Sequence, residues 1–115
     1  MKPLIDDDHR RHLLDNGAAA ARGERRDPLP IVKLVTLDAH ATWLLTELDP
    51  ADGDTAFGLI DLGMGRPELG HVKLSVLQNI RGPRDLAVVR DPHFTPKRLL
   101  SEYARLAERD GSIND

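Results

Sequence analysis

The sequence has no cysteine, few aromatic residues, no long apolar run and no large excess of either charge. Without cysteine, the chain can form no disulfide and offers no thiolate as nucleophile or metal ligand. Aromatic residues make up 3% of the chain, which disfavours a sheet that binds single-stranded nucleic acid by stacking. The net charge of −3 disfavours non-specific binding to duplex phosphates. The apolar runs are far shorter than the roughly 20 residues of a membrane span, so we expect a soluble, cytoplasmic protein.

The 115 residues are enough for a single domain with one modest core. The pattern along the chain divides this domain into four segments. They are a helical and basic segment (1–30), a β-meander (31–73), a short helix with an edge strand (74–94) and a C-terminal helix (95–111).

The first segment carries its own helix signals. Three aspartates at residues 6–8 favour the start of a helix, because their carboxylates suit its N-terminus. Asn16 and Gly17 form a typical helix end, so the sequence predicts that the helix stops there. The arginines that follow are interpreted as a solvated extension or hinge, with a basic patch for an acidic partner as the alternative.

Runs rich in β-branched residues and bounded by turn residues predict five strands, at 31–37, 41–48, 55–62, 68–73 and 86–90. The second and third form a hairpin around an acidic turn at residues 49–54. Symmetric pairing about this turn places Trp43 opposite Ile60 and Thr46 opposite Phe57, with Gly58 leaving room beside the indole. Both faces of the hairpin are apolar, so both must be covered.

Two further helices complete an α+β fold around an antiparallel sheet of four to five strands. Ser75 is the expected N-cap of a short helix before the last strand, and Thr95 with Pro96 predicts the start of an amphipathic C-terminal helix that ends at Gly111. The N-terminal helix has only a thin apolar edge. We therefore expect another molecule to cover part of one sheet face.

Glu47 and Asp61 are charged residues inside otherwise apolar strands. The symmetric register puts them on opposite faces, which weakens a paired acid/base role and favours strand ends or edges. A small hydrolase could still use Glu47, Asp61 and Glu68 with His40 or His71. The aspartates of the acidic turn lack the bidentate glutamate of a calcium loop, and the five histidines lack the spacing of a zinc site. We expect no metal and no cofactor. An internal ion pair between Arg90 and Asp91 is expected to anchor the chain after the last strand.

The runs PIVKLVTLDAHATWLLTELDPADGDTAFGLIDLG, PELGHVKLS and VVRDPHF resemble a family of short, uncharacterised bacterial proteins that are frequent on plasmids and integrative conjugative elements. The resemblance extends over residues 4–103. It is densest at Trp43, Glu47, Asp61, Gly63, Glu68, Gly70, Arg90 and Asp91. The chain differs at His71, where tyrosine is usual, and in SVLQNI, which is usually more acidic. The resemblance implies an accessory protein of a mobile element and no defined activity.

Our first hypothesis is a non-catalytic protein-binding module, which regulates or inhibits a host-defence machine or a conjugation or maintenance machine. The candidate binding residues are Trp43, Glu47, Phe57, Asp61, Glu68 and His71. The partner is a protein or a second copy of the chain. The alternatives are the hydrolase and a weak DNA-binding protein. The candidate nucleic-acid contacts of the latter are Arg10, Arg11, Arg22, Arg25 and Arg26.

Overall fold

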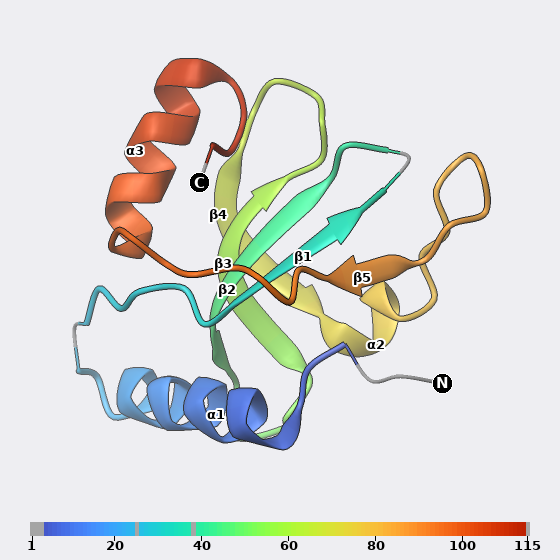
Figure 1. The fold of residues 1–115 in the computed structure, drawn as a ribbon. Helices are drawn as coiled ribbons and strands as arrows, with labels where there is room; N and C mark the ends of the chain where they lie inside the picture. The colour runs from blue at the N-terminus through green and yellow to red at the C-terminus, as the bar shows by residue number, and fades with distance from the viewer. Residues whose placement is uncertain (1–3, 25, 38, 115) are drawn as a thin grey trace.

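The computed structural model describes residues 4–24, 26–37 and 39–114, and its ribbon is shown in Figure 1. The helices are α1 (Asp7–Ala21), α2 (Leu74–Leu77) and α3 (Leu100–Asp110). The strands are β1 (Val32–Thr36), β2 (Thr42–Leu48), β3 (Thr55–Asp61), β4 (Glu68–Lys73) and β5 (Val88–Arg90). The predicted α+β class, with one antiparallel sheet and a helix near each end of the chain, is confirmed. No helix in these ranges has both the length and the apolar character that crossing a membrane requires.

The five strands form one sheet in the order β4-β3-β2-β1-β5. The first four strands are the predicted meander, in which each strand pairs with the next along the chain. The last strand, β5, returns across the sheet to pair with β1. Thus β4 and β5 are the two edge strands (Figure 1).

The register of the β2–β3 hairpin agrees with the prediction at Trp43, which lies opposite Ile60, and Leu45 lies opposite Gly58. Beyond Leu45 the prediction is wrong, because a β-bulge at Thr46 makes Glu47 the residue opposite Phe57. Gly58 also has a different role from the one predicted. A Cβ there would lie 1.9 Å from the carbonyl oxygen of Leu44. The absence of a side chain therefore lets the backbone of β2 approach β3 closely.

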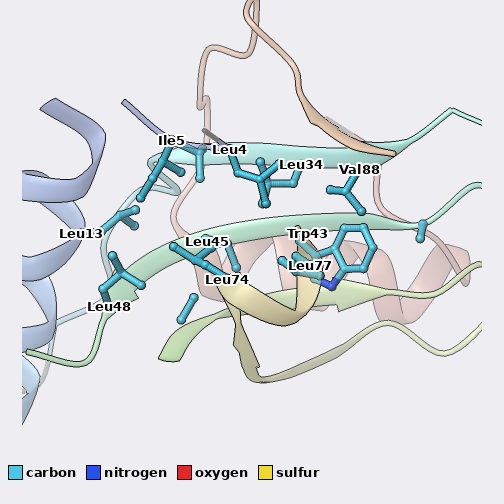
Figure 2. Close-up of a cluster of buried hydrophobic side chains, with 13 residues drawn as sticks. Leu4, Ile5, Leu13, Leu34, Trp43, Leu45, Leu48, Leu74, Leu77 and Val88 are labelled. Atoms are coloured by element: carbon cyan, nitrogen blue, oxygen red, sulfur yellow. The ribbon is translucent and has the colours of Figure 1, made fainter. Parts of the chain in front are cut away.

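The first face of the sheet carries Trp43. It is covered by the N-terminal segment and α1, which precede the strands in the sequence, and by α2, which follows β4. Buried residues of the N-terminal segment, α1 and α2 meet those of the strands in one cluster (Figure 2). Its buried members are Leu4, Ile5, Leu13, Val32, Leu34, Ala41, Trp43, Leu45, Leu48, Ala56, Leu74, Leu77 and Val88.

The second face is covered by α3. Leu100, Tyr103 and Ala107 of this helix bury Leu44 and Leu59 of the hairpin. The expectation that another molecule covers part of the hairpin is therefore not supported, because the chain's own helices cover both faces. The thin apolar edge of α1 suffices, since Leu4, Ile5 and α2 complete the layer.

The helix α1 does not end at Asn16 and Gly17 but runs on to Ala21, so the predicted end is wrong. The reason is tertiary packing. Gly17 is buried against the end of β2, where a Cβ would lie 1.7 Å from the carbonyl oxygen of Leu48. The side-chain amide of Asn16 donates to the carbonyl oxygen of Thr46 at 2.9 Å. Both residues thus dock the helix on the bulged strand.

The predicted starts of α2 and α3 are also wrong. The N-cap positions are Lys73 and Leu99, neither of which makes a side-chain cap hydrogen bond. Ser75 lies inside α2, and the backbone N–H of Ser75 donates to Asp54 at 2.9 Å. Gly111 closes α3, as predicted, and it adopts the left-handed conformation.

Candidate functional site

Three of the six candidate binding residues lie on neighbouring strands in one row across the sheet. Glu47 of β2 is paired with Phe57 of β3, and Phe57 is paired with His71 of β4. The bulge at Thr46 produces this row. In an unbulged hairpin, Thr46 would face Phe57 and Glu47 would point to the other side of the sheet.

A cavity of about 240 Å³ opens beside this row. Its other wall is the C-terminal half of α1, which contributes small residues. The lining consists of Gly17, Ala20, Ala21, Glu47, Asp49, Pro50, Thr55, Phe57 and His71. The docking of Asn16 and Gly17 on β2 brings this wall close to the strands.

The carboxylate of Glu47 is the group with the most unusual environment in the cavity. It is half-buried, and it makes no hydrogen bond or ion pair with any residue that the structure describes. Burial raises the pKa of Glu47 above its usual value, and the nearby His71 partly opposes this shift. The ring of His71 contacts the ring of Phe57, with centroids 5.0 Å apart and planes inclined at 54°.

The other three candidates lie elsewhere. Trp43 is 3% exposed in the first-face cluster (Figure 2), so a partner cannot reach it without opening the core. Asp61 is buried and accepts hydrogen bonds from the backbone N–H groups of Gly63 and Ile113, at 2.9 and 3.0 Å. It ties the segment after α3 to the end of β3. Glu68 is exposed at the start of β4.

The candidate nucleic-acid contacts are engaged within the chain. Arg10 donates to the carbonyl oxygen of Gly53 at 2.9 Å, and Arg11 pairs with Asp8 at 3.1 Å. Arg22 and Arg26 both pair with Glu24, at 2.6 and 2.9 Å. Arg25 lies outside the described residues. Neighbouring carboxylates thus offset the charge of three of these four arginines. The fourth, Arg10, donates a hydrogen bond to the backbone.

The acidic turn is held by hydrogen bonds from the chain itself. Asp49 accepts from the N–H of Ala51, and Asp52 accepts from the N–H groups of Asp54 and Thr55 and from the Thr55 hydroxyl. These bonds hold the pKa of Asp52 at about 2. In the described ranges, no three His, Asp or Glu side chains are placed to hold a metal ion.

Arg90 and Asp91 do not form the expected ion pair, because each contacts a different segment. Arg90 donates to the carbonyl oxygen of Leu4 at 3.3 Å and so fastens the N-terminal segment to the sheet. Asp91 accepts from the N–H of His93 and lies 3.9 Å from the ammonium of Lys33.

The outer edge of β4 is a feature that the sequence reasoning missed. The N–H of Leu74 donates to Asp54, so alternate residues of β4 (Gly70 and Val72) bond inward to β3. The backbone groups of Leu69, His71 and Lys73 therefore point away from the sheet. At Leu69 and His71, these groups bond to no other backbone group in the described part of the chain, whereas the carbonyl oxygen of Lys73 accepts the first hydrogen bond of α2.

An apolar groove of about 330 Å³ lies at the same edge. It is lined by Ile60, Leu62, Met64, Arg66, Glu68, Leu69 and Gly70. Leu62, Met64 and Leu69 are among the most exposed large apolar side chains, at 56, 79 and 49%. The signal in the sequence was Leu62 and Met64, two large apolar residues in and next to the glycine-rich loop before β4.

The chemistry available in the Glu47 cavity is limited. Glu47 and His71 could move a proton, but a hydrolase also needs a nucleophile or an activated water held by a third group. The other two candidate carboxylates are absent from the cavity, and the hydroxyl of Thr55 donates to Asp52 at 2.6 Å. The arrangement suits the binding of a ligand better than the turnover of one.

These observations define a small α+β domain with a carboxylate-lined cavity beside Glu47 and an open sheet edge at β4. The chain belongs to the family described as "Protein of unknown function (DUF2958)", whose model matches residues 4–114. A search of curated proteins and a search of solved structures gave no match.

Proposed function

We propose that this protein is a non-catalytic, cytoplasmic binding module that captures an extended segment of a protein partner. The observation that carries this proposal is the open edge of β4. Leu69 and His71 direct their backbone N–H and C=O groups outward, and Lys73 adds its N–H, so a strand of a partner can pair with this edge. Backbone pairing of this kind gives affinity, and neighbouring pockets give specificity.

The groove supplies such a pocket. A partner residue opposite Gly70 would have its side chain on the same face as Ile60. Because Gly70 has no side chain, that position leaves a gap, and a Cβ on Gly70 would lie only 3.6 Å from the Ile60 side chain. An apolar side chain of the added strand can therefore reach Ile60 and the exposed Leu62 and Met64.

The setting that we propose is a mobile genetic element. The resemblance to proteins of plasmids and integrative conjugative elements supports it, and the open edge supports action through another protein. In this proposal the module regulates or inhibits a host-defence machine or a machine for conjugation or maintenance.

The test is affinity capture of the tagged protein from a bacterial lysate that carries the parent element, with and without nuclease. We expect a stoichiometric protein partner that survives nuclease and is lost with Leu69→Pro. Proline is tolerated on an edge strand where its missing N–H faced solvent, so this change leaves the β3–β4 pairing in place.

A matched control is Leu99→Pro. Leu99 is 46% exposed, against 49% for Leu69, and its φ of −66° suits proline. This variant should retain the partner. A partner that Leu69→Pro also retains would exclude strand addition at β4, and a partner lost on nuclease would favour a nucleic-acid complex.

A hydrolase is the second candidate, because Glu47 and His71 line the same cavity. This candidate predicts turnover of a chromogenic ester or phosphoester that both Glu47→Gln and His71→Ala abolish. Equal rates for the wild type and the two variants would exclude it. No described feature favours DNA binding, since the described arginines of that candidate site are already engaged.

A further inference from the structure

The Glu47 cavity contains an unpaired negative group. The carboxylate of Glu47 has lost part of its water and has gained no hydrogen bond or ion pair from the described residues. Burying a carboxylate without a partner is unfavourable. A ligand that supplies a positive charge would therefore gain more here than at an exposed carboxylate of the same surface.

The remaining lining suits a flat cation. Phe57 contributes an aromatic ring, and Asp49 adds a second carboxylate. None of the lining residues is a lysine or an arginine. The wall from α1 is made of Gly17, Ala20 and Ala21, which leave the space unobstructed.

The size of the cavity points to a single side chain. Pockets for drug-sized ligands are roughly 300–1,000 Å³, whereas this cavity is about 240 Å³. It is also close to β4, because His71 belongs both to the cavity wall and to the open edge. A protein bound along that edge would thus have residues near the cavity mouth.

We propose that the cavity binds the guanidinium group of an arginine side chain presented by the protein partner, an inference that rests on the proposed function. Guanidinium is planar, forms two parallel hydrogen bonds with a carboxylate and stacks on aromatic rings. It is also less strongly hydrated than an ammonium group, so entering a partly closed cavity costs it less. Glu47 is the bidentate acceptor, and Phe57 is the stacking surface.

The test uses defined probes in place of the unknown partner. The ¹⁵N-labelled protein is titrated with acetyl-Gly-Arg-Gly-amide, and chemical shifts of the cavity amides are followed by NMR. The neutral control is the same peptide with citrulline, which keeps the shape of arginine and removes its charge. We expect saturable shifts at residues 47–49 and 71 with the arginine peptide and at least tenfold weaker binding of the citrulline peptide.

Glu47→Gln should abolish the saturable shifts, whereas Glu108→Gln should leave them unchanged. Glu108 is the matched control because it is an exposed glutamate on α3 that lines neither the Glu47 cavity nor the groove at β4. Phe57→Leu should weaken binding several-fold, because it keeps an apolar side chain and removes the aromatic face.

The stability of Glu47→Gln shows whether a loss of binding comes from unfolding. The folded-state pKa of Glu47 is raised above 4.5, so its charge destabilises the folded state at neutral pH. The variant should therefore melt at a higher temperature than the wild type at pH 7. The two should converge below pH 4.5, where Glu47 is protonated in both states. Asp49 and His71, which also line the cavity, are unchanged in this comparison.

Equal binding of the arginine and citrulline peptides, or unaltered binding to Glu47→Gln, would overturn the inference. A second arm uses agmatine, which carries guanidinium without a peptide. If agmatine binds more tightly than the peptide, the cavity serves a small cation and the assignment to a partner is wrong. This outcome is separable from failure of the proposed function, which is decided by Leu69→Pro in the capture experiment.

Discussion

The helices α1 and α3 differ in where their first turns find hydrogen-bond acceptors. In α1 the carboxylate of Asp6, directly before the helix, accepts from the N–H of His9 at 2.8 Å. In α3 the acceptor is Asp27, which takes hydrogen bonds from the N–H and the hydroxyl of Ser101, 74 residues further along the chain. One helix start is thus defined locally, and the other only by the folded structure.

The short helix α2 follows the pattern of α3. It begins Leu-Ser, as α3 does, and its serine donates both N–H and hydroxyl to a distant carboxylate, that of Asp54. A free N–H at a helix start needs an acceptor. Two aspartates in loops, Asp27 and Asp54, meet that need here, and in doing so they fix where each helix sits on the sheet.

The largest predicted effect concerns the docking of α1. Gly17→Ala should destabilise the protein by about 3 kcal/mol, because overpacking against a fixed backbone cannot be relieved by a rotamer change. Helix propensity alone predicts the opposite sign, since alanine favours a helix over glycine by about 1 kcal/mol. Chemical denaturation of the two proteins measures the difference.

Gly23→Ala is the control for this substitution. Gly23 has a φ of +82° and no atom within 4 Å of an added Cβ. Its replacement should therefore cost only the strain of a left-handed residue, about 1 kcal/mol. A Gly17→Ala protein as stable as the wild type would show that α1 does not lie this close to β2.

The remote cap of α3 should have an intermediate effect. Asp27→Ala should destabilise the protein by about 1 kcal/mol, the typical value of an N-cap. Ser101→Ala should cost less, because it removes only the hydroxyl. The double variant should fall short of the sum, since the two residues act on each other. Strict additivity in a double-mutant cycle would contradict the contact.

The smallest effect is expected for Asp6, the cap of α1, and it appears only at acidic pH. The hydrogen bond from the N–H of His9 is the main cause that lowers the pKa of Asp6 below 3.8. Stability from this group is therefore present above pH 3.8 and is lost as the pH falls through its lower folded-state value. Asp6→Asn keeps a good cap and should flatten stability against pH in this window.

Asp52→Asn is the reference for that acid measurement. In the wild type, hydrogen bonds hold the pKa of Asp52 at about 2. The contribution of Asp52 to stability is therefore lost between pH 3.8 and about 2. The wild type should show both losses, and each variant should lack one. If Asp6→Asn leaves the dependence of stability on pH unchanged, Asp6 does not cap the start of α1.

The features that local sequence determines were predictable. Strand positions followed from β-branched runs, the start of α1 from its aspartates, and the end of α3 from Gly111. The misplaced boundaries are those where tertiary contacts override a local signal. Asn16 and Gly17 are a typical helix end, yet they dock the helix on β2. Thr95 and Pro96 are a typical helix start, yet Asp27 fixes that start at Leu100.

In the candidate site, too, the residue types could be singled out from the sequence, whereas their arrangement depends on contacts that the sequence does not show. Glu47, Phe57 and His71 were singled out from their residue types, but their meeting depends on the bulge at Thr46, which no turn signal announced. Asp61 drew attention as a charge in an apolar strand. One of its two partners is the N–H of Ile113, 52 residues away, so sequence could not distinguish a structural carboxylate from a functional one.

The distance between Asp27 and Ser101 has a kinetic consequence. Closing a loop of 74 residues costs chain entropy before any contact repays it. The hydrogen bonds that begin α3 should therefore be absent from the folding transition state, while the turn of α1 at Asp6 can already be formed there. Substitutions at Asp27 should then accelerate unfolding and leave the folding rate almost unchanged. A contact of this kind slows unfolding without making folding faster, so it lengthens the lifetime of the folded protein.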